Sequence, residues 1–216
     1  VDGRGWVREG HTGGVRVLAR DAAHRERVTA VGRHVDLGGL AVLALMVPEF
    51  APQLLARGSE AGYHRVVLGV HHPLDVIGGR MVADAAVADR YADPRFRPLI
   101  LAAGQELRSE LEWRCGAALS VCIARDTPYR STAGAVSDYR QRMSYGLSRI
   151  GSAEAPFVAP PTAVALVQRV HPGMTSAQAT DLLRRGAYPA GYPLDDQRAG
   201  AQSWQRLDLA SAYAAR

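Results

Sequence analysis

Apolar residues recur at helical spacing through most of the chain, and this pattern constrains the fold more than any other feature. An apolar segment covers 37–47, and a Pro-Glu pair then opens an amphipathic stretch that we expect to cover 48–62. Two longer amphipathic stretches follow at 94–114 and 135–149. The only short run typical of a strand is VVLGV at 66–70. The sequence therefore predicts an all-α fold built as a helical bundle.

The segment 63–80, YHRVVLGVHHPLDVIGGR, places an arginine, two adjacent histidines and an aspartate within an apolar frame. Charged side chains are seldom buried without partners, so these groups indicate either an internal polar network or a reaction site. Pro73 suits the first turn of a helix, where its missing N–H would be unpaired anyway. His71 and Asp75 are four residues apart, so we expect them to face the same side of that helix.

A histidine held by a carboxylate, with an arginine nearby, can attack phosphorus. In this interpretation Asp75 accepts a hydrogen bond from the His71 ring, orients it and stabilises its cationic form. Arg65 would neutralise charge on the oxygens of the transferred phosphoryl group. The alternative is a buried Arg65–Asp75 ion pair with both histidines packed beside it, and the spacing alone is compatible with either.

These residues also carry a family resemblance. Arg65-x5-His71-x3-Asp75 is similar to the third signature of the phosphatidic acid phosphatase type 2/haloperoxidase superfamily, Ser-Arg-x5-His-x3-Asp. The surrounding segment 43–80 resembles the soluble bacterial acid phosphatase branch. The tail motifs GYPLDD and RLDLASAY resemble C-terminal features of secreted bacterial members.

The resemblance implies a helical bundle of the acid phosphatase/vanadium haloperoxidase type that hydrolyses phosphate monoesters without a metal or other cofactor. His71 would be the nucleophile that forms a phosphohistidine, Asp75 its orienting residue and Arg65 the phosphate clamp. The substrate would be a small-molecule phosphate ester, and the location periplasmic or secreted. Two alternatives stay open: a vanadate-dependent haloperoxidase, the one case in which vanadate is a cofactor, and a degenerate, non-catalytic anion-binding member.

The chain departs from the family pattern in its other signatures. His64 stands where the family has serine before the arginine, and no lysine is present to form the first signature, Lys-x6-Arg-Pro. The second signature, Pro-Ser-Gly-His, is also missing; in the family it supplies the acid that protonates the leaving group. We expect His34, at the end of VGRH, to take that role, with His11 in EGHT as the rival. The chain is thus either a fragment or a degenerate copy.

The composition of the sequence changes after Gly151, where SAEAPFVAPP forms a proline-rich connector. We therefore divide the chain into a phosphatase-like helical core at 1–150, with its N-terminal part truncated, and a C-terminal extension at 151–216 packed on that core. Cys115 and Cys122 are too far apart to bridge on one straight helix, but Gly116 could break that helix and permit a disulfide. Two free thiols are equally compatible with the sequence.

The distribution of charge and the length of the apolar runs argue against two classes of partner. The formal net charge is +5, but the arginines are scattered among acids along the whole chain, which argues against nucleic-acid binding. No apolar run approaches the roughly 18–20 residues that a transmembrane helix needs, so we expect no transmembrane segment. The oligomeric state stays open, a homo-oligomer included.

Overall fold

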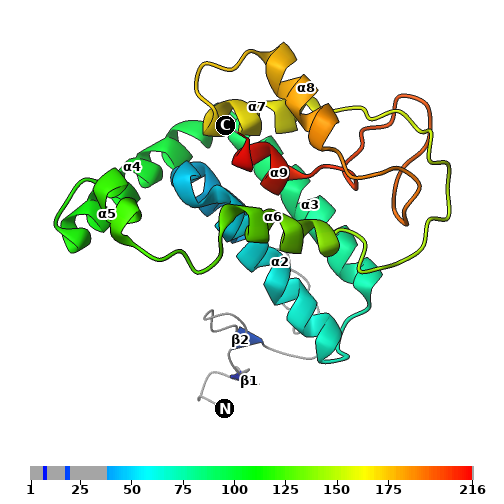
Figure 1. Cartoon of the computed structure of the whole chain (residues 1–216), viewed down its shortest axis with the longest axis horizontal. Coiled ribbons are helices and arrows are strands. Elements are labelled where there is room, and N and C mark those ends of the chain that lie inside the picture. The colour runs from blue at the N-terminus through cyan, green and yellow to red at the C-terminus, as the bar shows by residue number, and fades with distance from the viewer. Residues whose placement is uncertain (1–6, 9–17, 20–37, 216) are drawn as a thin grey trace.

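The computed structural model describes residues 7–8, 18–19 and 38–215 (Figure 1). Apart from the two-residue strands β1 (Val7–Arg8) and β2 (Leu18–Ala19), which pair antiparallel, the regular secondary structure of the described residues is helical. The helical residues 38–46 are followed by η1 (Pro48–Phe50), α2 (Ala51–Val67), α3 (Pro73–Ala92), α4 (Arg97–Cys115), α5 (Leu119–Arg125), α6 (Thr132–Gln141), α7 (Pro161–Val170), α8 (Ser176–Gly186) and α9 (Leu209–Ala214). The prediction of an all-α fold is confirmed.

Helix α2 continues past Gly62, where we expected it to end, and takes in the first two residues of the 66–70 run. Gly62 permits the close approach of α2 and α3, because a Cβ atom there would lie 2.4 Å from Cγ1 of Val76. The helix ends shortly before Gly69, whose φ of +70° favours glycine. The 66–70 run, although typical of a strand, therefore forms a helix end and a turn, in agreement with the all-α prediction.

Two other helices differ from the sequence-based expectation. The helix expected at 135–149 is α6, which ends at Gln141. Beyond it the chain turns, and Tyr145 and Gly146 both have positive φ angles, 51° and 75°. Helix α7 was not anticipated, because it follows the proline-rich connector directly. Its Pro161 occupies the first turn, where a missing N–H has no cost.

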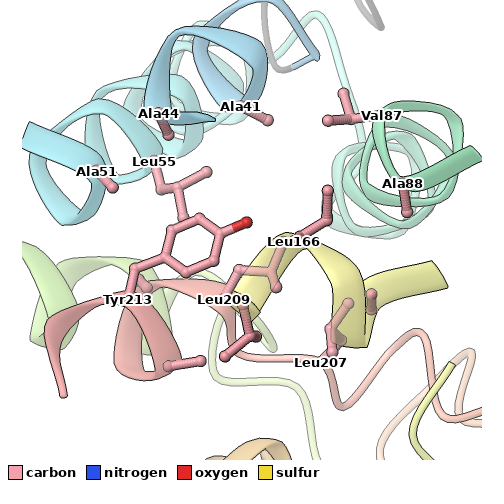
Figure 2. Packing of buried hydrophobic residues seen from close by; sticks show 14 of the residues in the cluster. Ala41, Ala44, Ala51, Leu55, Val87, Ala88, Leu166, Leu207, Leu209 and Tyr213 are labelled. Atoms are coloured by element: carbon pink, nitrogen blue, oxygen red, sulfur yellow. The ribbon is translucent and has the colours of Figure 1, made fainter. Parts of the chain in front are cut away.

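The hydrophobic core takes residues from both sides of residue 150. Leu55 of α2 and Val87 of α3 pack in one cluster with Leu166 of α7 and with Leu209 and Tyr213 of α9 (Figure 2). Burying an aliphatic side chain of this size stabilises a fold by roughly 1.5–3 kcal/mol. Segments on either side of the proline-rich connector therefore build the same core.

A buried polar network fixes the C-terminal segment to α3. Arg80 and Asp84 are 5% and 3% exposed and form an ion pair at 3.2 Å. Arg80 also donates hydrogen bonds to the carbonyl oxygens of Gln205 (2.7 Å) and Leu207 (3.3 Å). Neither the ion pair nor these hydrogen bonds were anticipated, and the hydrogen bonds tie α3 to a stretch more than 120 residues away in the sequence.

The two cysteines are bridged. Cys115 ends α4 and forms a disulfide with Cys122 of α5, with Cα atoms 6.2 Å apart. Gly116 caps α4 with a φ of +75°, which reverses the chain and brings α5 back toward it. The helix break that would permit a disulfide is thus present. No helix in the described ranges is sufficiently long and apolar to span a bilayer.

Candidate active site

The residues singled out in the sequence lie where α2 passes into α3. Arg65 is half-buried on the last turn of α2, and α3 begins at Pro73. The intervening turn is closed by backbone hydrogen bonds, among them Val70 N–H to the carbonyl of Arg65 at 3.1 Å. This turn lies at one end of the bundle, where the two helices meet (Figure 1). Arg65, His71 and Asp75 therefore belong to a single corner, formed by the end of α2, the turn and the start of α3.

His71 and Asp75 lie against each other at this corner. Nδ1 of His71 is 3.6 Å from Oδ2 of Asp75, which is an ion-pair distance when the ring is protonated and is longer than a hydrogen bond. The His71 side chain is only 14% exposed, whereas that of Asp75 is 63% exposed. The pair therefore combines a shielded imidazole with a hydrated carboxylate.

The same segment also caps α3. Nδ1 of His72 accepts a hydrogen bond from the backbone N–H of Leu74 at 3.2 Å, and Oδ2 of Asp75 accepts one from the N–H of His72, also at 3.2 Å. This reciprocal arrangement is a capping box with histidine in place of serine or threonine. Asp75 consequently has two roles in the structure, since its Oδ2 both caps the helix and faces His71.

A cluster of one arginine and two tyrosines, Arg142, Tyr63 and Tyr145, lies beside the corner. The guanidinium of Arg142 lies 5.3 Å from the ring centre of Tyr63, one turn before the corner on α2, and donates to Oγ of Ser59 at 3.0 Å. The ring of Tyr63 stacks on that of Tyr145 with centres 6.4 Å apart. Burial raises the pKa of Tyr145 to about 12. Sequence reasoning missed this group, because residues 142–146 were expected to continue a helix.

His64, which stands at the position of the family's serine, belongs to another cluster on α2. Its Nε2 lies 3.7 Å from Oε1 of Glu60, one turn earlier. The other oxygen of Glu60 accepts hydrogen bonds from Arg57 at 2.5 Å and from the Tyr129 hydroxyl at 3.0 Å. The Arg57 hydrogen bond is the largest of the effects that lower the pKa of Glu60. His64 therefore faces a carboxylate that is already held by two donors.

His34 and His11, the two candidates for the leaving-group acid, lie outside the described residues. Across 38–215 and the two short strands, no group of three or more His, Cys, Asp or Glu side chains is arranged to hold a metal ion. The described part of the site thus consists of the nucleophile candidate, its carboxylate and the arginine.

Comparison with known proteins points to acid phosphatases. The chain is 34% identical over 89 residues to a non-specific acid phosphatase of Providencia stuartii. The matched segment covers 41% of this chain and 34% of that protein. It thus spans about a third of the length of this curated relative. No family model matches the chain, and no solved structure matches it. Over this segment the chain is similar to an acid phosphatase.

Proposed function

We propose that this protein is a phosphatidic acid phosphatase type 2-like acid phosphatase that hydrolyses small phosphate monoesters through a phosphohistidine. The observation that carries the proposal is the contact between His71 and Asp75 at the corner that also bears Arg65. The similarity to a non-specific acid phosphatase supports the same class of reaction.

The proposed chemistry follows from which ring nitrogen faces the carboxylate. Nδ1 of His71 faces Asp75, so the proposed mechanism assigns the attack on phosphorus to Nε2. As the N–P bond forms, the P–O bond to the leaving group breaks and the ring becomes cationic, which the Asp75 carboxylate stabilises. Arg65 neutralises charge on the phosphoryl oxygens. Water then attacks the phosphohistidine, which releases phosphate and restores the neutral ring. No step in this scheme assigns a role to a metal.

The test is hydrolysis of a chromogenic aryl phosphate at mildly acidic pH by the wild-type chain and by His71→Ala. Loss of turnover in the variant, with an unchanged melting temperature, is the expected result. Equal rates for the two proteins would end the proposal. Halide oxidation that requires added vanadate and peroxide would instead favour a haloperoxidase.

His34 is proposed as the acid that protonates the leaving group. An alkoxide leaves poorly unless it is protonated as it departs, whereas a nitrophenolate leaves readily without help. His34→Ala should therefore cripple hydrolysis of glycerol phosphate and largely spare an aryl phosphate, and His11→Ala should do neither. The same asymmetry seen for His11→Ala would move the role to that residue.

A second candidate function, a non-catalytic anion-binding protein, is favoured by one observation. Asp75 is largely hydrated and already caps α3, so its hold on His71 is weaker than a direct hydrogen bond would give. In that case phosphate or vanadate would raise the melting temperature by mass action, and no ester would be turned over.

The Cys115–Cys122 disulfide supports a periplasmic or secreted location, because disulfides persist in oxidising compartments. Fractionation of the source cells with an antibody against this chain tests that proposal. Recovery with the cytosolic fraction, with both thiols free, would contradict it.

A further inference from the structure

A cavity of about 480 Å³ lies far from the α2–α3 corner, between η1, α4 and the end of α7. Its charged and polar lining comprises Glu49, Gln105, Arg108, Arg169 and His171. Glu49 precedes α2, and Arg65 lies on the last turn of that helix. At 1.5 Å per residue the two are separated by roughly 24 Å along the helix axis. The cavity is therefore distinct from the candidate active site.

Two of the charges in the cavity satisfy each other. Arg108 donates to both carboxylate oxygens of Glu49, at 2.8 and 2.7 Å. This hydrogen bonding is the main reason why the pKa of Glu49 lies below its usual range. Such a two-pronged pair is geometrically specific, and it forms one fixed wall of the cavity.

Arg169 is the unsatisfied charge. Its Nε is buried without a hydrogen-bond partner, and in the part of the chain that the structure describes its guanidinium forms no hydrogen bond or ion pair. Its charge acts on Glu49 only through space. Nε of Arg80 is also unpaired, but the guanidinium groups of Arg80, Arg140 and Arg206 each donate through their other nitrogens or Nε to two or more protein oxygens. A donor that is buried and unpaired is unfavourable, because it loses its hydration without gaining a hydrogen bond.

His171 offers a second polar group beside Arg169. Its Nε2 lies 2.8 Å from the carbonyl oxygen of Ala212, so that nitrogen carries the hydrogen and donates it. The ring is thereby fixed against α9, and Nδ1 is left for another contact. The cavity thus combines an unpaired guanidinium, a fixed imidazole and the amide of Gln105.

We propose that this cavity binds the oxyanion group of a small molecule, a carboxylate or a phosphate, on Arg169. A guanidinium fork matches the two oxygens of such a group, and the bound oxyanion satisfies the donors that the protein leaves unpaired. The Glu49–Arg108 pair, already neutralised, excludes the ligand from that wall and directs it to Arg169.

Calorimetric titration with malonate and with inorganic phosphate tests the proposal. The titrations use Arg65→Gln protein, so that the candidate active site contributes as little as possible. In this background, a second substitution, Arg169→Gln, should weaken anion binding at least tenfold. Adding Arg125→Gln, which removes an equally positive but exposed side chain, should leave the affinity unchanged. The tighter of the two anions then identifies the ligand class.

Only the Arg169→Gln variant, and not Arg125→Gln, should lose affinity for the anion. Melting temperatures of all variants show that each is folded, and Arg169→Gln should melt no lower than its parent, because an unpaired buried donor is removed. Absence of saturable binding for both anions would overturn the proposal. So would equal affinities with and without Arg169, or equal losses for Arg125→Gln and Arg169→Gln.

Discussion

Two pairs of side chains that can carry opposite charges share the i, i+4 spacing and lie in opposite environments: Arg80 and Asp84 within α3, and His71 and Asp75 at its start. Arg80 and Asp84 are almost fully buried, 3.2 Å apart, and Arg80 also holds two carbonyls of the C-terminal segment. His71 and Asp75 are 3.6 Å apart at the start of the same helix, and the carboxylate is 63% exposed. One spacing therefore produces both a structural lock and a candidate reaction centre.

The difference shows that burial decides whether such a pair contributes to the stability of the fold or to its chemistry. A buried pair cannot exchange partners without leaving a charge desolvated, so its interaction energy belongs to the fold. A hydrated carboxylate beside a shielded imidazole is free to respond when that imidazole becomes cationic. Disrupting the first pair should therefore unfold the protein, whereas disrupting the second should change its chemistry.

The largest effect is expected from Arg80→Met. The substitution leaves Asp84 buried without its cation and two carbonyls without donors, so unfolding in urea should show a loss of about 3–5 kcal/mol. Arg125→Met, at an exposed position on α5, is the matched control and should change stability little. A loss of unfolding free energy below about 1 kcal/mol for Arg80→Met would show that the pair contributes little to the stability of the fold.

Next in size is a dependence of stability on pH that arises from Asp84. Desolvation outweighs the attraction of Arg80 and raises the pKa of Asp84 from 3.8 to about 6. Because the folded state holds this proton more tightly, the contribution is full below pH 4 and is lost as the pH rises through about 6. The change is at most about 3 kcal/mol.

Asp84→Asn isolates this contribution, because it cannot titrate. Urea unfolding at a series of pH values should show the wild-type protein losing stability relative to Asp84→Asn between pH 4 and 6. Parallel curves for the two proteins would mean that Asp84 ionises normally in the fold.

Asp75→Asn should show the opposite behaviour to Arg80→Met. The amide still caps α3 but carries no charge to stabilise an imidazolium, so turnover of an aryl phosphate should fall at least about 100-fold. Urea unfolding should show a change within about 1 kcal/mol. Asp89→Asn, an exposed position on the same helix, is the control and should retain full activity. Early melting of Asp75→Asn with full specific activity would assign Asp75 to capping alone.

The smallest effect on the site is expected from the disulfide, which belongs to neither pair. Closing so short a loop stabilises by at most about 2–3 kcal/mol. The only buried side chain of α5 is Leu119, so removal of the bridge should loosen α4 and α5 locally. The Cys115→Ser/Cys122→Ser double variant should keep its aryl phosphate turnover and lose hydrogen-exchange protection in α5. A collapse of turnover would mean that this hairpin supports the site.

The sequence predicted the local features well and the distant ones poorly. Helical spacing located most of the bundle, and Pro73 marked the start of α3 because a proline at a helix start has a local cause. The capping role of Asp75 was not predicted, because histidine, which caps α3 at position 72, is not among the usual N-cap residues. The partners of Arg80 could not be found this way, because Gln205 and Leu207 become its neighbours only after the chain folds.

The central claim, that His71 is a phosphorylated nucleophile, is tested most directly by trapping the intermediate. Wild-type protein is mixed with an aryl phosphate, quenched at alkaline pH, where phosphohistidine survives, and digested for mass spectrometry. We predict a phosphoryl group on His71 and none on His72, whose Nδ1 accepts the helix-capping hydrogen bond. His71→Ala should carry no adduct. Turnover without any adduct on His71, or an adduct that persists on His72 or His64 in His71→Ala, would contradict the account.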